Sequence, residues 1–276
     1  ENLFLSQCGV TDYIYFNDGL GNFQPVPLGD TETVADAEVG DVTGDGKLDI
    51  VVANSNAPCG SSTSRIYKNI IPPSNIAIEP IIGSGGFPLF IDVTANSLSN
   101  PVFAYSLELG DFDNDSDLDF ITSQGLFPSQ CSAIRVFKNN GVGVFTEQAG
   151  SIPTAVTTHY CYKIEAVDLD NDMNLDLVVT NPAPNATNSG LIFLKNNGNA
   201  VFSMQPVTIN GVFYSSGVAY PAAKTYDLDS GDVNNDGSVD LFVTLLNTNP
   251  FPGLGIKFAL LNNNNNWNFN TNSYFY

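Results

Sequence analysis

Four short runs of apolar, mostly β-branched residues recur along the chain, and each follows directly on a cluster of acidic residues. The runs read IVVAN from Ile50, FITS from Phe120, LVVT from Leu177 and LFVT from Leu241. β-Branched and aromatic side chains fit a pleated, half-buried surface, so these runs predict strands. Helix-like periodicity is nearly absent, and we therefore expect an all-β fold.

A second pattern joins pairs of β-rich runs through a tight turn. The segments IYFNDGLGNF, RVFKNNGVGVF and IFLKNNGNAVF place Asn-Gly or Asp-Gly between two runs and end at Phe23, Phe145 and Phe202. This arrangement is the strongest short-range signal for a β-hairpin. ALLNNNNNWNF, ending at Phe269, is a looser version, and IYKNIIPPSN from Ile66 substitutes prolines for the turn.

The two patterns combine into one repeat: strand, acidic cluster, strand, variable loop, strand, tight turn, strand. The acidic clusters begin at Asp41, Asp111, Asp168 and Asp232, at steps of 70, 57 and 64 residues. A four-stranded repeat of about 60 residues is typical of a β-propeller blade. We expect one β-propeller domain over 1–276, with blades at the ranges 1–30 (incomplete), 34–80, 103–152, 160–210 and 224–270.

The two ends of the chain bear on closure of the propeller. The opening ENLFLSQC aligns with FITSQGLFPSQC, so it resembles the second strand of a blade whose first strand is missing. We favour a five-bladed ring in which 271–276 complete the first blade. A part of a longer propeller, or a strand from a neighbouring subunit, are the alternatives. The first residue is Glu rather than Met, and we expect a processed or trimmed chain.

The acidic clusters have the composition of calcium loops. Calcium takes six to eight oxygen ligands from carboxylates, carbonyls and water. Numbered from the first aspartate, positions one, three, five and nine carry side-chain oxygens in all four copies: Asp41, Thr43, Asp45, Asp49; Asp111, Asp113, Asp115, Asp119; Asp168, Asp170, Asp172, Asp176; and Asp232, Asn234, Asp236, Asp240. The carbonyl at position seven adds a backbone ligand, from Lys47, Asp117, Asn174 and Ser238. We therefore expect up to four bound Ca²⁺.

Position six and position twelve refine this interpretation. Gly46 and Gly237 at position six relieve the curl of the loop, whereas Ser116 and Met173 take that place in the other two copies. An EF-hand needs a glutamate at position twelve and flanking helices. Position twelve here is apolar or threonine, and the following segments favour strands, so the loops are expected to join strand to strand.

These DxDxDGxxD-like loops and hairpins resemble the FG-GAP or VCBS repeat family, whose blades form the propeller of integrin α-subunits and many secreted propellers. The resemblance covers essentially the whole chain. It implies that calcium lies between the first and second strands of each blade, on one face of the propeller. It also implies that the longer connecting loops lie on the opposite face.

Charge and composition indicate an exported protein. The net charge is −20, and fourteen of the acids occupy ligand positions, so four calcium ions bring the charge to −12. Nucleic acids and anionic membranes are poor partners for such a surface. No apolar run approaches membrane-spanning length, and we expect no membrane insertion. Extracellular calcium, near millimolar, suits such loops, so we expect a secreted or cell-surface location.

The cysteines agree with that location. Cys8, Cys59 and Cys131 fall in the same loop of successive repeats, and Cys161 is placed on the same face. Four cysteines allow three connectivities. Neighbouring blades favour the disulfides Cys8–Cys59 and Cys131–Cys161. Asn185, in the sequence Asn-Ala-Thr, is an expected glycosylation site.

Function is expected to be non-enzymatic. The sole histidine, His159, leaves little room for a nucleophilic triad, and most acids are assigned to calcium; a polysaccharide lyase or hydrolase is the less favoured alternative. Four further acids, each three residues before a loop, are expected to orient the loops or to line a central channel: Glu38, Glu108, Glu165 and Asp229.

We expect a structural or adhesive module that contacts a protein partner, or copies of itself, through variable loops. Loops on a rigid scaffold usually carry binding function. The candidate contact residues are Tyr160, Phe213, Tyr214 and Tyr220. The alternative is a lectin-like propeller that binds glycans. These aromatic residues do not recur at equivalent positions in the repeats, and this favours the adhesive module.

Overall fold

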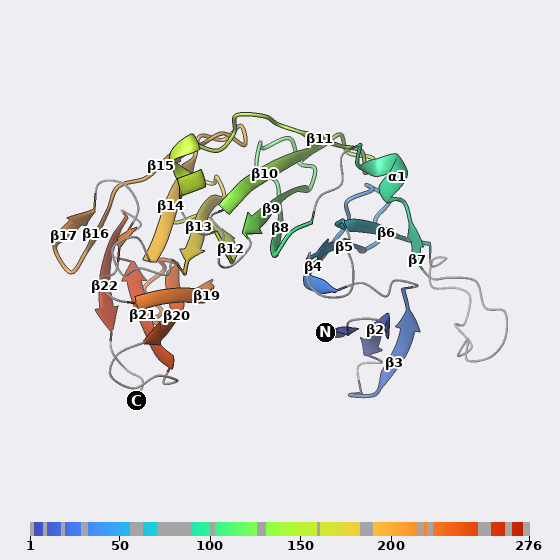
Figure 1. The fold of residues 1–276 in the computed structure, drawn as a ribbon, viewed down its shortest axis with the longest axis horizontal. Helices are drawn as coiled ribbons and strands as arrows, with labels where there is room; N and C mark the ends of the chain where they lie inside the picture. Colours follow the sequence, from blue (N-terminus) through green and yellow to red (C-terminus); the bar gives the residue numbers. More distant parts are fainter. Residues whose placement is uncertain are drawn as a thin grey trace. The chain divides into compact units, whose positions relative to one another are not determined.

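The computed structural model describes residues 3–7, 10–17, 20–28, 33–55, 63–70, 90–99, 103–125, 131–158, 161–182, 190–214, 218–219, 223–247, 255–262 and 267–272 (Figure 1). These residues are almost entirely β-strand. The helical elements among them are α1 (Thr94–Ser97) and one turn of 3₁₀-helix (Thr154–Thr158). The chain forms two compact units, one of residues 1–104 with 139–146 and the other of 105–138 with 147–276.

The first unit holds two antiparallel sheets. The first sheet has the order β1-β2-β3, with β1 (Leu3–Gln7), β2 (Val10–Asn17) and β3 (Phe23–Pro27). The second sheet has the order β4-β5-β6-β7, with β4 (Val34–Gly40), β5 (Asp49–Asn54), β6 (Arg65–Asn69) and β7 (Phe90–Asp92). The first sheet therefore has three described strands.

Three sheets follow along the chain. The third has the order β8-β9-β10-β11, from β8 (Ser106–Gly110), β9 (Asp119–Gly125), β10 (Cys131–Asn139) and β11 (Phe145–Glu147). The fourth contains β12 (Ile164–Val167), β13 (Asp176–Asn181), β14 (Gly190–Asn196) and β15 (Phe202–Met204), and β18 (Val218–Ala219) also pairs with β14. The fifth contains β19 (Ala223–Gly231), β20 (Asp240–Asn247), β21 (Gly255–Asn262) and β22 (Asn268–Asn272).

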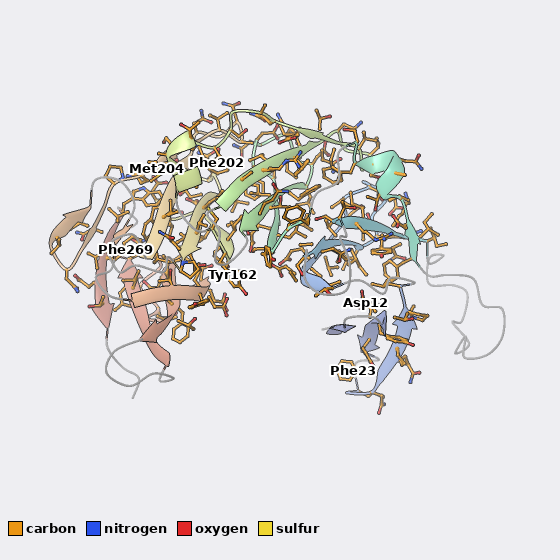
Figure 2. The ribbon with its side chains drawn as sticks, in the orientation of Figure 1. Asp12, Phe23, Tyr162, Phe202, Met204 and Phe269 are labelled. Atoms are coloured by element: carbon orange, nitrogen blue, oxygen red, sulfur yellow. The ribbon has the colours of Figure 1, made fainter. Side chains whose placement is uncertain are left out.

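The last strand of every sheet begins at or next to a phenylalanine. Phe23, Phe90, Phe145 and Phe202 open their strands, and Phe269 is the second residue of β22. Phe202 and Phe269 are buried (Figure 2). In the second sheet this strand is β7, which comes later than the expected range of 34–80, because a long segment separates it from β6.

The structure contains one hairpin that was not among those expected from the sequence. Strands β16 (Val207–Ile209) and β17 (Val212–Tyr214) pair with each other, and β16 adds in parallel to β22. Asn210 and Gly211 form the turn with φ of 49° and 79°. This is the Asn-Gly signal that identified the other hairpins, and it was present in the sequence.

Apolar cores lie between successive sheets within each unit. Along β13, Leu177 and Val179 belong to the core shared with the third sheet, whereas Val178 belongs to the core shared with the fifth. Both faces of this strand are covered, so its side chains form a continuous apolar run rather than an alternating one. The same burial on both faces explains the run Leu191 to Leu194 in β14.

These sheets confirm the expected all-β fold of four-stranded, antiparallel, blade-like units. Each described repeat runs in the predicted order, with neighbouring strands in sequence also neighbouring in the sheet. Of the closing strand expected from 271–276, Thr271 and Asn272 instead belong to β22 of the fifth sheet, paired with β21. Positions 273–276 lie outside the described residues, so closure of the ring stays a prediction.

Candidate metal-binding loops

Each acidic motif forms the connection between the first and second strands of its sheet. The residue before the motif pairs with position nine in all four copies: Gly40 with Asp49, Gly110 with Asp119, Val167 with Asp176 and Gly231 with Asp240. The strand ends therefore close the loop at both sides. We refer to the loops by their residues, as the 41–49, 111–119, 168–176 and 232–240 loops.

The carboxylate at position one organises the turn. One of its oxygens accepts the N–H of position five at 3.0 to 3.1 Å, and the other accepts the N–H of position six at 2.7 to 3.0 Å, in all four loops. The position-five carboxylate then accepts the N–H of position seven at 2.9 to 3.1 Å. These bonds curl the backbone around the carboxylates.

The curl places two residues of each loop in the left-handed region. Position six has φ between 70° and 85°, and position four has φ between 59° and 68°. Position four is Gly44, Asn114, Asn171 or Asn235, residue types that tolerate this conformation. Met173 at position six, with φ of 70°, is 85% exposed. An unbranched side chain pointing into solvent is therefore accommodated where glycine was expected.

Position nine is the buried end of each loop. Its four aspartates are 0% exposed, and one carboxylate oxygen accepts a backbone N–H of position two or three at 3.0 to 3.3 Å. Burial raises the pKa of Asp176 to about 7, and it also raises the pKa of Asp49 and of Asp240. A buried carboxylate with a raised pKa gains from a nearby cation, because the cation favours its ionised form.

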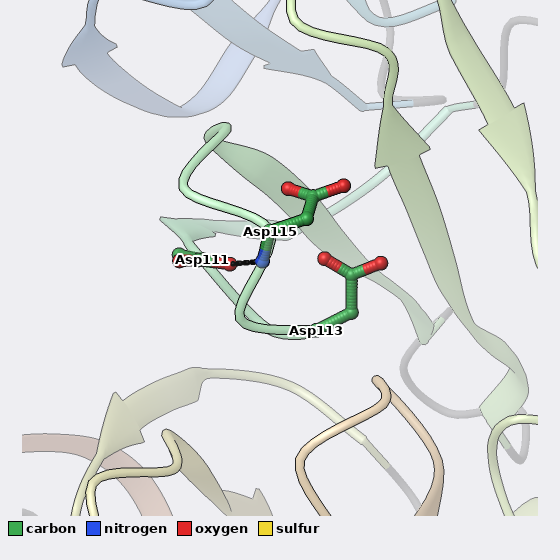
Figure 3. A group of neighbouring side chains, drawn as sticks. All are labelled: Asp111, Asp113 and Asp115. Carbon is green, nitrogen blue, oxygen red and sulfur yellow. Dashed lines mark hydrogen bonds between the residues drawn. The ribbon is translucent and has the colours of Figure 1, made fainter.

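The carboxylates gather most closely in two of the loops. Oxygens of Asp111, Asp113 and Asp115 lie within 4.8 Å of one another, and so do those of Asp168, Asp170 and Asp176. Figure 3 shows the first of these groups on its loop, with the N–H of Asp115 donating to Asp111. Among the described residues, no such group of three forms in the 41–49 or the 232–240 loop, where position three is Thr43 or Asn234.

In three of the loops, position three carries a buried oxygen atom that accepts no hydrogen bond. The buried atoms Asp113 Oδ1, Asp170 Oδ1 and Thr43 Oγ1 accept no hydrogen bond. The side chain of Asp113 is only 5% exposed. Burying a polar oxygen without a partner costs free energy, and a bound hard cation removes that cost. Carboxylate, carbonyl and hydroxyl oxygens suit such a cation, so the residues present can hold a metal ion.

Lysines from the third strand of each sheet reach three of the loops. Lys68 Nζ lies 3.1 Å from Asp45, Lys138 pairs with Asp113, and Lys195 pairs with Asp170 and lies 2.9 Å from Asp172. These lysines are functional residues that were not expected from the sequence. A signal was present, because Lys-Asn ends the third strand in three repeats.

In the fourth and fifth sheets, the asparagine next to the lysine position ties its own loop to the loop of the preceding sheet. Asn196 N–H donates to Asp176 at 2.9 Å, while its Nδ2 donates to the Phe112 carbonyl at 2.8 Å. Asn262 repeats this arrangement on Asp240 and the Leu169 carbonyl, each at 2.8 Å. In the first unit, Asn139 Nδ2 donates to the Val42 carbonyl at 2.9 Å.

The hairpin turn following that asparagine covers the preceding loop. Ala200 N–H also donates to the Phe112 carbonyl, at 2.8 Å. Asn114 of the preceding loop donates through Nδ2 to the Gly198 carbonyl at 3.2 Å. Gly198 has φ of +83°, and an added Cβ would lie 2.8 Å from Asn174 Oδ1 in its own loop. In the fifth sheet, Trp267 takes the place of Ala200, and its Nε1 donates to Asp170 Oδ2 at 2.9 Å. The Asn-Gly turns are therefore part of the loop environment as well as hairpin turns.

The fourth loop is the most open of the set. Asp232, Asn234 and Asp236 are exposed, whereas position three is partly buried in the other three loops. Within the described residues, no hairpin turn covers the 232–240 loop.

Several predicted site residues lie outside the described residues. They are Cys8, Cys59, His159, Tyr160, Asn185 and Tyr220. The backbones of Cys131, Phe213 and Tyr214 lie in strands, but their side chains are not among those described; Cys161 is buried. The disulfides, the glycosylation site, the partner contacts and the position-seven carbonyl ligands therefore stay predictions. In the described part of the chain, no helix is long and apolar enough to cross a membrane.

Comparison with known proteins supports the repeat interpretation. A protein-family model described as FG-GAP-like repeat matches residues 3–52, which run from β1 through the 41–49 loop into β5. No match to the chain was found among curated proteins. Such repeats are typical of β-propeller protein-interaction modules and of extracellular proteins. The resemblance expected from the loops and hairpins is thus confirmed for this segment, and residues 3–52 carry an FG-GAP-like repeat.

Proposed function

We propose that the protein is a secreted, calcium-binding structural or adhesive module, in which calcium stiffens the blades and the variable loops contact a protein partner. The observation that carries the calcium assignment is the buried, unpartnered oxygen at position three. Asp113 Oδ1 and Asp170 Oδ1 each lie in a loop whose backbone already curls around three carboxylates. Because these buried oxygen atoms accept no hydrogen bond, they can coordinate a metal ion without a hydrogen bond first being broken.

Calcium fits these loops better than magnesium. Calcium accepts six to eight oxygens in flexible geometry, whereas magnesium demands a near-ideal octahedron and keeps several of its waters. Each loop offers side-chain oxygens from four positions and a backbone carbonyl within nine residues. Position-one and position-nine carboxylates are held by backbone N–H groups before any ion arrives. Such pre-arranged ligands reduce the ordering required on binding.

Calcium titration of the metal-stripped protein, followed by calorimetry, tests this assignment. We expect calcium to bind with a stoichiometry above one, and magnesium to bind more weakly. Asp111→Ala together with Asp168→Ala should remove the two sites whose carboxylates gather most closely. Asp36→Ala is the matched control, because Asp36 lies in β4 outside the loops. Unchanged calcium heats in the double variant would contradict the assignment.

The structural or adhesive role rests on the division between uniform and variable segments. The four loops share one backbone conformation down to single hydrogen bonds, which is what a structural element requires. The connections opposite them differ in length and sequence, and a rigid scaffold with variable loops is the usual arrangement for binding. A surface with a net charge of −20 favours partners with basic or neutral contact surfaces.

Two measurements on the calcium-loaded protein separate this role from the lectin alternative. Sedimentation over a range of concentrations tests self-association, and a glycan array tests sugar binding. Reversible self-association, or capture of a purified surface protein that chelator abolishes, is the expected outcome. Reproducible binding to one class of glycan, competed by free sugar, would replace the adhesive role with the lectin role.

A further inference from the structure

In three of the four loops, a lysine from the third strand of the same sheet forms an ion pair with a loop carboxylate. We propose that Lys68, Lys138 and Lys195 are tethered counter-ions of the loops, which hold the carboxylates in place without calcium and must be displaced for calcium to bind. The proposal rests on the calcium-binding function proposed above. It assigns to these lysines the role of affinity-determining residues, with a divalent cation as the competing ligand.

The 168–176 loop shows the arrangement most completely. Lys195 Nζ pairs with Asp170 and also lies 2.9 Å from Asp172, so it bridges positions three and five. These are two of the positions expected to bind calcium. The lysine therefore occupies carboxylate oxygens that calcium needs.

The 111–119 loop repeats the arrangement in a more buried setting. Lys138 pairs with Asp113 through Oδ2, while Oδ1 of the same carboxylate has no hydrogen-bond partner. The ammonium thus satisfies only half of a carboxylate that is 5% exposed. Calcium can coordinate several oxygens at once, so it can satisfy the atom that lysine leaves unpaired.

The 232–240 loop is the natural contrast within the same chain. Aligning its third strand on the Lys-Asn pairs puts Leu261 in the lysine position, next to Asn262. Asn262 still donates to Asp240, so the local backbone is the same as in the other sheets. This loop has three carboxylates and no lysine. Among the described side chains no cation pairs with this loop, and its first three expected side-chain ligands, Asp232, Asn234 and Asp236, are exposed.

Replacement of the lysine tests the proposal. In Lys195→Met the loop loses its competitor while the side chain keeps its length, so calcium should bind more tightly, by about tenfold, the size typical of linked binding events. Without calcium the same variant should melt at a lower temperature, because the carboxylates repel one another. Lys163→Met is the control, since it removes the same charge from an ion pair with Glu108 outside the loops.

Trp267 offers a direct readout of the 168–176 loop. It is the single tryptophan of the chain, and its Nε1 donates to Asp170 Oδ2, the oxygen that also pairs with Lys195. Calcium binding at Asp170 should change the indole emission in wild type. The midpoint of this change should move to lower calcium in Lys195→Met. It should stay at the wild-type concentration in Lys163→Met.

The outcomes separate this proposal from the calcium assignment itself. If wild type shows no calcium-dependent signal by fluorescence or calorimetry, both are overturned. If wild type binds calcium and Lys195→Met binds equally or more weakly, the lysine proposal alone is overturned. A gain shared by Lys163→Met would also overturn it, because a general charge effect would then explain the result. Should Lys195→Met fail to fold, Lys195→Gln provides the same comparison with a polar side chain.

Discussion

Asp117 and Asp119 lie two residues apart in the 111–119 loop, yet their carboxylates have different surroundings. Asp119 is fully buried and accepts the Phe112 N–H at 3.2 Å. Asp117 is only partly buried, and within the described loop its carboxylate accepts none of the backbone hydrogen bonds. The curled loop therefore leaves Asp117 near the surface, whereas Asp119, the first residue of β9, is directed inward.

This difference predicts unequal effects of alanine substitution. Asp119→Ala leaves a buried backbone N–H without its acceptor and removes a calcium ligand, so it should cost about 3 kcal/mol of unfolding free energy. Asp111→Ala should cost a similar amount, because Asp111 accepts two N–H groups. Asp117→Ala should cost under about 1 kcal/mol. Urea unfolding in calcium measures all three, and equal losses for Asp117 and Asp119 would contradict the loop geometry.

Two glutamates outside the loops should contribute to stability with opposite dependence on pH. Burial raises the pKa of Glu165, which accepts the Ser230 hydroxyl at 2.7 Å, whereas the hydrogen bond from Arg135 lowers the pKa of Glu147. A raised pKa gives stability that is present below the unfolded pKa and lost as pH rises through the folded pKa. A lowered pKa gives stability that is present above the unfolded pKa and lost as pH falls through the folded pKa.

Glutamine substitution should therefore act with opposite sign at the two positions. At about pH 8, Glu165→Gln should raise the melting temperature and Glu147→Gln should lower it, and both differences should shrink toward about pH 4. Thermal unfolding of the two variants and wild type at constant calcium measures this. The same sign of change for both variants at the higher pH would contradict the assigned surroundings.

At the scale of elements, the hairpin turn joins neighbouring sheets as well as neighbouring strands. Asn196 ends β14, and its side chain donates to the carbonyls of Phe112 and Leu175 at 2.8 and 3.1 Å. Its own N–H donates to Asp176. One residue thus contacts two loops in successive sheets, so the position of each loop depends on the sheet that follows it.

Replacing Asn196 should lower the unfolding free energy more than replacing a neighbouring asparagine does. Asn196 is 1% exposed, and Asn196→Ala leaves the buried Phe112 and Leu175 carbonyls without this donor, which should cost about 2 kcal/mol. Asn199 is exposed in the same turn, and Asn199→Ala should change stability by less than about 0.5 kcal/mol. Denaturant unfolding compares the two, and a small effect at Asn196 would show that the turn does not hold the loops.

The element scale also shows what sequence could and could not supply. Positions one and nine were predictable because a ligand must carry oxygen, and every repeat has aspartate there. Lys195 and Asn196 were not assigned, because their roles depend on contacts with residues 20 or more positions away. Strand β7 lies at Phe90–Asp92 because the repeat contains a long segment after β6, and no periodic pattern indicates how long such a segment is.

At the scale of the whole molecule, acidic charge is concentrated where the structure can neutralise it. Fifteen of the 29 acids lie in the four loops, fourteen of them at expected ligand positions, and among the described residues Lys68, Lys138 and Lys195 pair with loop carboxylates. Within the described part of the chain, these ion pairs leave most of the loop charge unbalanced. We therefore expect calcium to be a component of the folded protein, because calcium binding favours the folded state by mass action.

The stabilisation of the fold by calcium is best tested by thermal unfolding of the metal-stripped protein, with and without millimolar calcium. Calcium binds the folded loops far better than the unfolded chain, so we predict a rise in melting temperature on the order of 5 °C or more, reversed by a chelator. Magnesium at the same concentration serves as the control and should give a smaller rise. A melting temperature that neither calcium nor chelator changes would contradict the account.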